Sequence, residues 1–183
     1  MTDIIETDRL IIKNSDISLA EALLKYYSDN RIFFEKYEPV FQDSFYTYEY
    51  QKKVMEFEMN NMEKHISAYY YFSLKEKPED IIGTISFVRI RKEPYASTIF
   101  GYNQDEKHQG HGYCSEACAA SIRDVLGKNH IHRIESRALT TNQKSINILK
   151  RLGFEEEGIE RKGILIDGSF RDHYRFAYIN ENY

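Results

Sequence analysis

The stretch KHQGHGYCSEAC, residues 107–118, places two glycines, two histidines and two cysteines within twelve residues. Imidazole and thiolate groups are common ligands of zinc. A glycine pair ahead of a helix instead lets a phosphate group approach unpaired backbone amides. In a third interpretation the glycines only form a turn and the histidines are solvated. These residues therefore admit a metal site, a phosphate site or neither.

The metal interpretation takes His108, His111, Cys114 and Cys118 as ligands. The two cysteines are four residues apart and share a helical face with Ala117, which indicates small core residues. Two cysteines on one helical face also have poor geometry for a mutual disulfide, so we expect free thiols. The spacing therefore predicts no metal.

A dinucleotide interpretation reads the run from Gly110 to Ser115 as G-x-G-x-x-G, with Ser115 in the third glycine position. Glu135 would then be the acid that binds the ribose. Such a fingerprint opens a series of crossover units, whereas here it follows antiparallel strands and only one crossover remains. The order of elements disfavours a dinucleotide.

A diphosphate fits the same loop better. Amides at a helix start are unpaired, glycines expose them, and the helix dipole favours negative charge. Lys107 adds a full positive charge. The loop has no Gly-Lys-Ser/Thr to hold a magnesium triphosphate, so we do not expect a triphosphate hydrolase.

The elements that must position this loop follow in the order strand, two helices, three strands, helix, strand, helix and two strands. Periodicity and turn residues predict strands at 9–13, 68–74, 81–90, 97–103 and 132–139, followed by a hairpin turning at Asp167-Gly168. They predict helices after an Asn14 to Asp16 cap, over 47–62, from 112 or 113 to a stop at Gly127, and from Asn142 to Gly153. The crossover predicts that 97–103 and 132–139 are parallel neighbours in an otherwise antiparallel sheet.

Length and charge limit the possible functions. The 183 residues suit one domain, 1–183, and the net charge of −4 disfavours a protein that works by neutralising nucleic-acid phosphates. The start of the chain has acidic residues where a secretion signal would be basic, and no stretch is apolar enough to span a membrane. We therefore expect a cytoplasmic protein with no direct nucleic-acid or membrane partner.

The chain resembles the Gcn5-related N-acetyltransferases, in particular the branch that acetylates the N-termini of ribosomal proteins. The resemblance covers nearly the whole chain, from ETDRLIIK through GTISF, FGYN, HQGHGYCSEA and HRIESRALTTNQKSINILKRLGFEEEGIERKG to the DG hairpin. It implies a single-domain α/β (α+β) fold with a mixed, mostly antiparallel sheet, one splayed parallel strand pair and flanking helices. It also implies transfer of an acetyl group from acetyl-CoA to a primary amine.

The same resemblance implies the site residues. The family loop that binds the pyrophosphate reads Lys107, His108, Gln109, Gly110, His111, Gly112 here and runs on to Tyr113, with Lys107 in place of Gln or Arg. The preceding strand, 99–103, corresponds to a bulged strand that splays from its neighbour and pairs with pantetheine; Gly101 suits such a bulge. This places Tyr102 and Asn103 at the cofactor, with a backbone N–H near Tyr102 as the oxyanion donor.

Beyond that strand, Asn142 matches a residue that contacts the cofactor, and Ser145 matches a serine that protonates the leaving thiolate. Ser145 also lies three residues after a helix cap and could serve only the first helical turn. Many relatives have a Tyr acid where this chain has Leu149, and some have a Glu base where it has Ile164. The base is therefore unassigned.

The remaining candidates for the base are Glu35, Glu135 and the tyrosines at 69–71. A weak base suits an α-amine, whose pKa near ~8 lies well below the ~10.4 of a lysine amine. The acceptor is therefore expected to be a primary amine, such as the N-terminus of a ribosomal or other protein. A small amine such as a polyamine, an amino acid or a drug is one alternative, and a non-catalytic CoA sensor is another. Monomer and homodimer both remain open.

Overall fold

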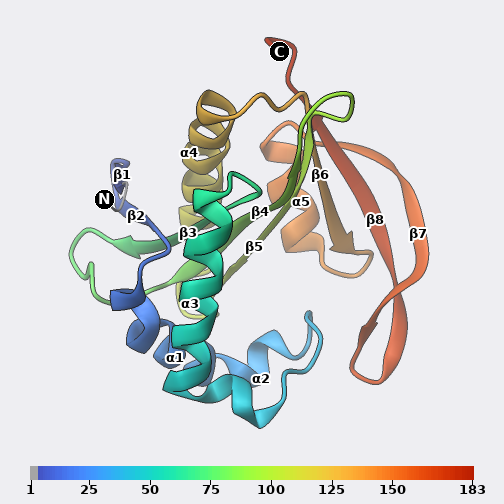
Figure 1. The fold of residues 1–183 in the computed structure, drawn as a ribbon. Coiled ribbons are helices and arrows are strands. Elements are labelled where there is room, and N and C mark those ends of the chain that lie inside the picture. Colours follow the sequence, from blue (N-terminus) through green and yellow to red (C-terminus); the bar gives the residue numbers. More distant parts are fainter. Residues whose placement is uncertain (1–3) are drawn as a thin grey trace.

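An eight-stranded sheet crosses the molecule in the computed structural model, which describes residues 4–183 (Figure 1). The strand order is β1-β2-β3-β4-β5-β6-β8-β7, and the only parallel pair among these strands is β5 with β6. The strands are β1 Ile4–Glu6, β2 Leu10–Asn14, β3 Ser67–Leu74, β4 Gly83–Arg91, β5 Ser97–Gln104, β6 Arg133–Leu139, β7 Glu155–Ile166 and β8 Ser169–Ile179. The predicted mixed sheet with one parallel pair is confirmed.

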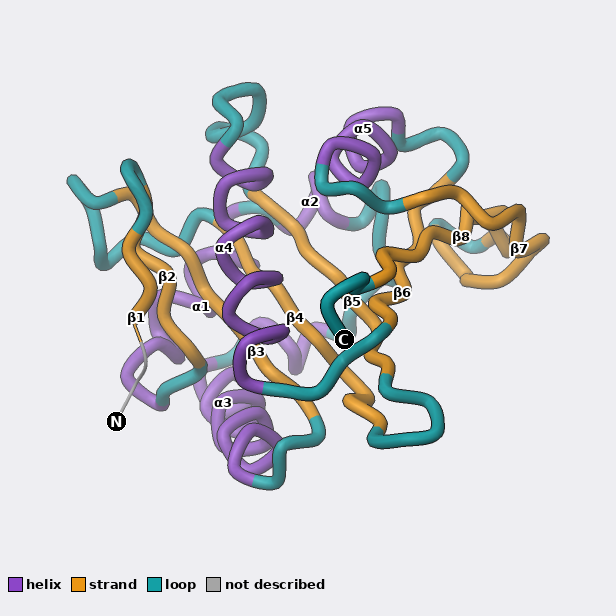
Figure 2. Tube along the Cα trace, turned by 90° about the horizontal axis from the view of Figure 1, so that it is seen from above, coloured by secondary structure: helices purple, strands orange, loops and turns teal. Residues whose placement is uncertain are grey.

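Helices cover both faces of this sheet (Figure 2). On one face lie α1 Ala20–Asp29, α2 Arg31–Phe34 and α3 Tyr48–Glu63, together with the short 3-10 helices η1 Ile17–Leu19 and η2 Asp43–Tyr46. On the other face lie α4 Tyr113–Lys128 and α5 Gln143–Arg151. No helix within residues 4–183 combines the length and apolar composition of a bilayer crossing.

The aromatic strand β3 shows why both faces are covered. Tyr70 and Phe72 belong to the core beneath α4 and α5, whereas Tyr71 belongs to the core with α1 and α3. Successive side chains of a strand point to opposite faces, so an uninterrupted aromatic run must be buried twice. The sheet is therefore the middle of three layers.

The parallel pair separates after three residues. Ser97 to Ile99 pair with Arg133 to Glu135, and beyond Ile99 the strand β5 stays with β4 while β6 stays with β8. At the point of separation, Ser136 Oγ donates a hydrogen bond of 3.0 Å to the Phe100 carbonyl. The predicted splay is confirmed, and it leaves the β6 side of β5 without a strand partner beyond Ile99 within residues 4–183.

The predicted bulge at Gly101 is wrong. Gly101 pairs regularly with Ser86, and the irregularity between β4 and β5 lies between Val88 and Arg91. A Cβ on Gly101 would lie 3.3 Å from the Ser86 Oγ. The glycine therefore allows close approach of a cross-strand side chain.

Helix ends agree with the sequence in most places. Thr47 and Asn142 cap α3 and α5, and Asp167 and Gly168, with φ of 48° and 68°, form the turn between β7 and β8. The predicted stop at Gly127 is wrong, since α4 continues to Lys128. The short elements β1 and α2 were not predicted, because three or four residues carry too little periodicity.

Candidate active site

Two cavities meet where β5 leaves β6. The first, here called the α4–α5 cavity, has a volume of about 570 Å³. The second, the α1–α3 cavity, has a volume of about 350 Å³. Glu38, Tyr102 and Asn103 line both of them. The two cavities therefore approach the opening of the sheet from its two faces.

The glycine loop forms one wall of the α4–α5 cavity. Gly110 and Gly112 line it and have φ of 83° and 80°, a conformation that strains other residues. Helix α4 begins directly after Gly112 with no capping side chain. A Cβ on Gly112 would lie 3.5 Å from the Arg9 Nη2, and one on Gly110 would meet no atom within 4 Å. The wall is therefore exposed backbone at the positive end of a helix.

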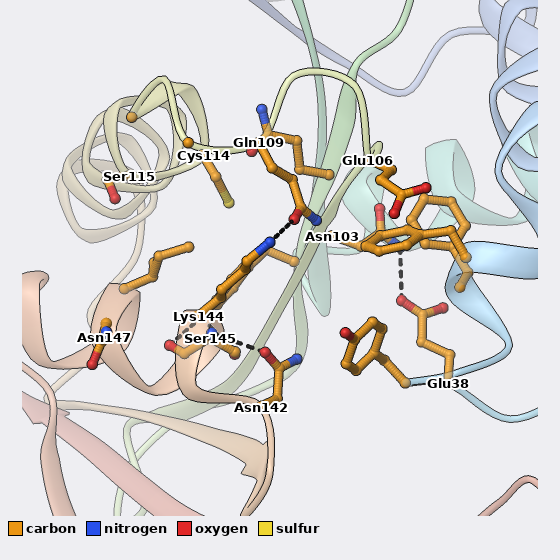
Figure 3. Close-up of a pocket in the computed structure, with 18 of the residues that line it drawn as sticks. Glu38, Asn103, Glu106, Gln109, Cys114, Ser115, Asn142, Lys144, Ser145 and Asn147 are labelled. Atoms are coloured by element: carbon orange, nitrogen blue, oxygen red, sulfur yellow. Dashed lines mark hydrogen bonds between the residues drawn. The ribbon is translucent and has the colours of Figure 1, made fainter.

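The opposite wall comes from α5 and carries two cations. Lys144 Nζ donates to Gln109 Oε1 at 2.8 Å, across the space between the loop and α5 (Figure 3). Arg151 Nη1 donates to Ser115 Oγ at 3.2 Å. Both cations line the cavity, which they share with the start of α4. An anionic diphosphate fits this combination of free amides and positive charge.

Four residues predicted to bind the cofactor have side chains outside both cavities. Lys107 is exposed. His108 hydrogen-bonds Asp105 through its Nδ1, at 2.6 Å. His111 stacks on Tyr113 with ring centroids 5.5 Å apart. These side chains shape the loop, and a cofactor contact by any of them stays a prediction.

The residues of the metal interpretation do not converge. Cys118 is fully buried and Cys114 is 4% exposed, and their sulfur atoms lie 3.9 Å apart. Burial raises the pKa of the Cys118 thiol well above its usual range. No group of three or more His, Cys, Asp or Glu within residues 4–183 has the arrangement of a metal site. Both thiols are free, as predicted.

Tyr102 and Ser145 join β5 to α5 at the sheet opening. The Tyr102 hydroxyl lies 2.9 Å from Ser145 Oγ and donates to the Ser145 carbonyl at 3.0 Å. Asn142 Oδ1 accepts the Ser145 N–H at 3.1 Å, so Asn142 acts as the helix cap. Burial raises the pKa of Tyr102, which keeps its proton at neutral pH. Leu149, by contrast, is fully buried in the core.

Asn103 points to the other face of the sheet and holds Glu38. Its Oδ1 accepts from the Tyr26 hydroxyl at 2.6 Å and from Thr84 Oγ1 at 2.9 Å. Its Nδ2 donates to Glu38 Oε1 at 3.0 Å (Figure 3). Burial raises the pKa of Glu38. Sequence reasoning missed Glu38 because it lies in an irregular segment with no periodic signal.

The α1–α3 cavity contains a second carboxylate, Glu58 on α3. The residue is 9% exposed, and its Oε2 accepts hydrogen bonds from Ser15 Oγ and, at 2.6 Å, from the Tyr71 hydroxyl. Burial raises the pKa of Glu58 to about 7, although both hydrogen bonds lower it. Among the four glutamates of this helix the sequence did not single it out. The available signal in the sequence was its position three residues after Met55, which places both on one face of a helix. The structure shows that both are buried.

The earlier candidates for the base lie elsewhere. Glu35 pairs with Arg31 at 3.0 Å, and Glu135 pairs with Arg133 at 3.2 Å. Neither Glu35 nor Glu135 lines either cavity. Of the three tyrosines at 69–71, Tyr69 and Tyr71 line the α1–α3 cavity and Tyr70 turns to the opposite face. A role for Glu35 or Glu135 as the base has no support in these positions.

Comparisons with known proteins agree with this geometry. Residues 9–155 match the acetyltransferase (GNAT) domain family. The [ribosomal protein uS5]-alanine N-acetyltransferase of Escherichia coli (strain K12) is 35% identical over 91% of this chain and 86% of its own length. The crystal structure of a ribosomal-protein-S5-alanine acetyltransferase from Vibrio fischeri superposes with a TM-score of 0.94 at 27% identity, over 98% of both chains.

A third relative has a bound ligand in its structure. It is a ribosomal L7/L12 α-N-protein acetyltransferase in complex with coenzyme A, which superposes with a TM-score of 0.86 at 21% identity. The match covers 97% of this chain and 98% of that one. At this identity the likeness concerns the fold.

Proposed function

The chain belongs to the GNAT acetyltransferase family, and from that premise we propose that it transfers the acetyl group of acetyl-CoA to the N-terminal α-amine of a protein. That it is an N-acetyltransferase follows from the family; the acceptor and the roles of the residues are the proposal. The observation that carries it is the meeting of two cavities at the opening between β5 and β6. One has Lys144 and Arg151 beside the unpaired amides of α4, and the other has Glu38 and Glu58 in its lining.

The α4–α5 cavity is the proposed site of acetyl-CoA. Gly110, Gly112 and the first amides of α4 would hold its pyrophosphate, assisted by Lys144 and Arg151. Beyond Phe100, whose carbonyl accepts from Ser136 Oγ, the β6-facing edge of β5 has no strand partner within residues 4–183, and its backbone groups suit the amides of the pantetheine arm. The bound cosubstrate supplies the thioester, whose carbonyl is the electrophile.

The α1–α3 cavity is the proposed site of the amine. Two of its lining residues, Glu38 and Glu58, are carboxylic acids, and none is Lys, Arg or His. Tyrosines supply most of the remaining polar lining. A primary amine is an ammonium ion at neutral pH, so the carboxylates of this lining attract it. The α4–α5 cavity instead holds charges of both signs, because Glu38 and Glu106 line it together with Lys144 and Arg151.

The groups at the meeting point suit acyl transfer. A backbone N–H of β5 near Tyr102 would stabilise the oxyanion that forms on the thioester carbonyl, and one such donor is worth about 3 to 4 kcal/mol. The Ser145 and Tyr102 hydroxyl groups, 2.9 Å apart, would supply the proton for the leaving thiolate. Leu149 cannot supply it, because it has no ionisable group and is fully buried.

The relatives named as alanine acetyltransferases of a ribosomal protein favour a protein acceptor here. A second candidate is a polyamine, because two ammonium groups could pair with the two carboxylates of the α1–α3 cavity. Residues 1–183 as one domain, a cytoplasmic location, a monomer or homodimer, and the lack of nucleic-acid or membrane partners stay predictions.

An amine panel tests the proposal. Thiol release from acetyl-CoA is measured with short peptides beginning with Ala, Ser or Asp, with spermidine and with free amino acids, and mass spectrometry locates the acetyl group. We expect peptides beginning with Ala to be acetylated at the α-amine, with no turnover of the same peptide already acetylated there. Faster turnover of spermidine than of every peptide would establish the small-amine alternative. Binding of acetyl-CoA without turnover of any amine would contradict catalysis.

A further inference from the structure

We propose that Glu58, on helix α3, is the general base that removes a proton from the acceptor amine. The inference rests on the proposed function, because it takes the α1–α3 cavity to be the amine site. It fills the role left open by Ile164, which lies on β7 outside both cavities.

The hydrogen bonds of Glu58 leave one of its oxygens available. Ser15 and Tyr71 both donate to Oε2, and Oε1 accepts no hydrogen bond from any residue of 4–183. The same cavity is also lined by Gly101 and Tyr102, just beyond the point where β5 leaves its parallel neighbour. Glu58 therefore shares a cavity with the position at which the thioester carbonyl would arrive.

Among residues 4–183, no Lys, Arg or His that would fix the charge of Glu58 lines its cavity. The titratable groups that line it with Glu58 are Tyr69 and Tyr71 of β3, Tyr27 of α1, Tyr102 of β5 and Glu38 from the segment after α2. Tyr71 stays protonated and donates, because burial raises its pKa well above the usual range. The carboxyl group thus combines burial with hydrogen bonding through one oxygen only. Such a group is suited to exchange a proton near neutral pH.

Burial raises the pKa of Glu58 to about 7, which brings it closer to the pKa of the acceptor amine. An ordinary glutamate, with a pKa near ~4.3, lies almost four units below an α-amine near ~8, whereas Glu58 lies about one unit below it. Transfer of the proton from the ammonium to Glu58 is therefore close to balanced. A lysine acceptor, near ~10.4, would remain more than three units away.

The proposed step balances as follows. The ammonium loses one proton to Glu58, and the neutral amine forms a C–N bond to the thioester carbonyl carbon. The C–S bond breaks, and the thiolate takes a proton from the Ser145 and Tyr102 pair. The nitrogen loses its second proton on becoming an amide, and that proton restores the Ser145 and Tyr102 pair. Glu58 then releases the first proton to solvent, so one proton in total leaves the site.

The test is the dependence of kcat on pH for Glu58→Gln, measured between about pH 6 and 9 at saturating peptide and acetyl-CoA. Glutamine keeps the size and can still accept from Ser15 and Tyr71. For the wild-type chain we expect kcat to fall as the pH drops below about 7. For Glu58→Gln we expect kcat to be about 10²-fold lower at pH 7.5 and to rise with pH without a plateau. The KM for acetyl-CoA should change less than about twofold.

Two variants serve as controls. Glu56→Gln alters an exposed glutamate of the same helix and should keep the wild-type profile. Glu38→Gln removes the other carboxylate of the cavity and should raise the KM for the peptide while keeping the fall of kcat below pH 7. The assignment would be overturned if kcat no longer fell below pH 7 in Glu38→Gln but still fell below pH 7 in Glu58→Gln.

Chemical rescue separates a base from a structural residue. Added formate should raise the kcat of Glu58→Ala at least tenfold over its value without formate, because a small carboxylate can occupy the space left by the side chain. A wild-type kcat and pH profile in Glu58→Gln would overturn the inference while leaving the proposed function intact, since the amine would still be acetylated. Failure of the wild-type chain to acetylate any amine would overturn both.

Discussion

At the scale of single residues, the site depends on side chains whose role is set by a neighbour. The hydroxyl of Ser145 contacts that of Tyr102, whereas its backbone N–H satisfies the Asn142 cap. The two interactions are independent, because one uses the side chain and the other the main chain. Ser145 can thus stabilise the first turn of α5 and still act as a proton donor.

Substitution of Ser145 tests the proton donor. We expect Ser145→Ala to lower kcat by about 10²-fold and to leave the KM for acetyl-CoA nearly unchanged, since the backbone bond to Asn142 persists. Initial rates at varied acetyl-CoA provide both constants. Tyr102→Phe should show a loss of similar size, because it breaks the same pair. A wild-type kcat in both variants would exclude the pair as the acid.

Lys144 is the residue that tests the anion site. Its ammonium now hydrogen-bonds Gln109, and it lines the α4–α5 cavity opposite the start of α4. We expect Lys144→Gln to raise the KM for acetyl-CoA about three- to tenfold at low salt, with less effect on kcat. The matched control is Lys150→Gln on the same helix, whose partner is Glu156 outside the cavity. An equal change in both variants would contradict a specific phosphate contact.

At the scale of elements, one glycine loop and one helix provide the anion site, and the turn between β1 and β2 supports them. Arg9 Nη1 donates to the His111 carbonyl at 2.9 Å, and its guanidinium lies 4.6 Å from the centre of the Tyr113 ring. Glu116, in the first turn of α4, accepts from Arg9 Nε and from Thr7 Oγ1, at 2.7 and 2.6 Å. The turn between β1 and β2 therefore holds the loop that the cofactor is proposed to use.

Substitution of Gly112 should remove cofactor binding. Its φ of 80° disfavours a side chain, and an aspartate there would add negative charge beside the phosphate. We expect Gly112→Asp to weaken coenzyme A binding by at least about 10²-fold in calorimetry. Gly168→Asp, at a positive-φ turn remote from the loop, is the control for strain alone. Unchanged affinity in Gly112→Asp would count heavily against the assignment of this loop.

The hydrogen bonds that Glu116 accepts from Thr7 and Arg9 predict a dependence of stability on pH. Burial raises the pKa of Glu116, but the hydrogen bonds from Thr7 and Arg9 outweigh it, so the net pKa is lowered. A carboxyl group whose pKa is lower in the folded state stabilises above its unfolded pKa, and this stabilisation is lost as the pH falls through the folded value. We expect Glu116→Gln to lower the free energy of unfolding by about 1 kcal/mol at pH 7. Urea titrations should show this difference shrinking below about pH 4; a constant difference would contradict it.

At the scale of the whole molecule, the reaction site exists because two strands separate and two layers of helices leave space beside the opening. Residues from α2, β5, α4 and α5 line the first cavity, and residues from α1, α3, β3, β4 and β5 line the second. A ligand that spans several elements should therefore stabilise all of them together.

Coenzyme A binding should raise the melting temperature. At a ligand concentration about 100 times Kd, binding adds about 2.7 kcal/mol of stability. For a chain of this length we expect a rise of about 5 to 10 °C in a thermal unfolding scan. Lys144→Gln should reduce the rise at the same ligand concentration, whereas Glu58→Gln should leave it unchanged. An equal loss of the coenzyme A-induced rise in melting temperature in both variants would contradict separate sites for the two substrates.

The sequence by itself determined the order of elements, the parallel pair, the glycine loop at the start of α4 and the caps of α3 and α5. The parallel pair follows from the strand–helix–strand crossover. The other features depend on neighbours within a few residues, through periodicity, cap chemistry or the φ angle that glycine permits. The same local signals failed at Gly127 and Gly101, because a glycine can also sit inside a helix or beside a large neighbour.

Only the tertiary structure decided which carboxylates belong to the site. Glu38 and Glu58 are twenty residues apart, and folding brings both to a cavity that also contains Tyr102. The proton affinity of each depends on burial, which is a property of the packed layers and leaves no mark on the residue type. In the sequence, Glu35 and Glu135 could not be distinguished from Glu38 and Glu58 as candidate bases. In the folded chain they pair with arginines outside the cavities.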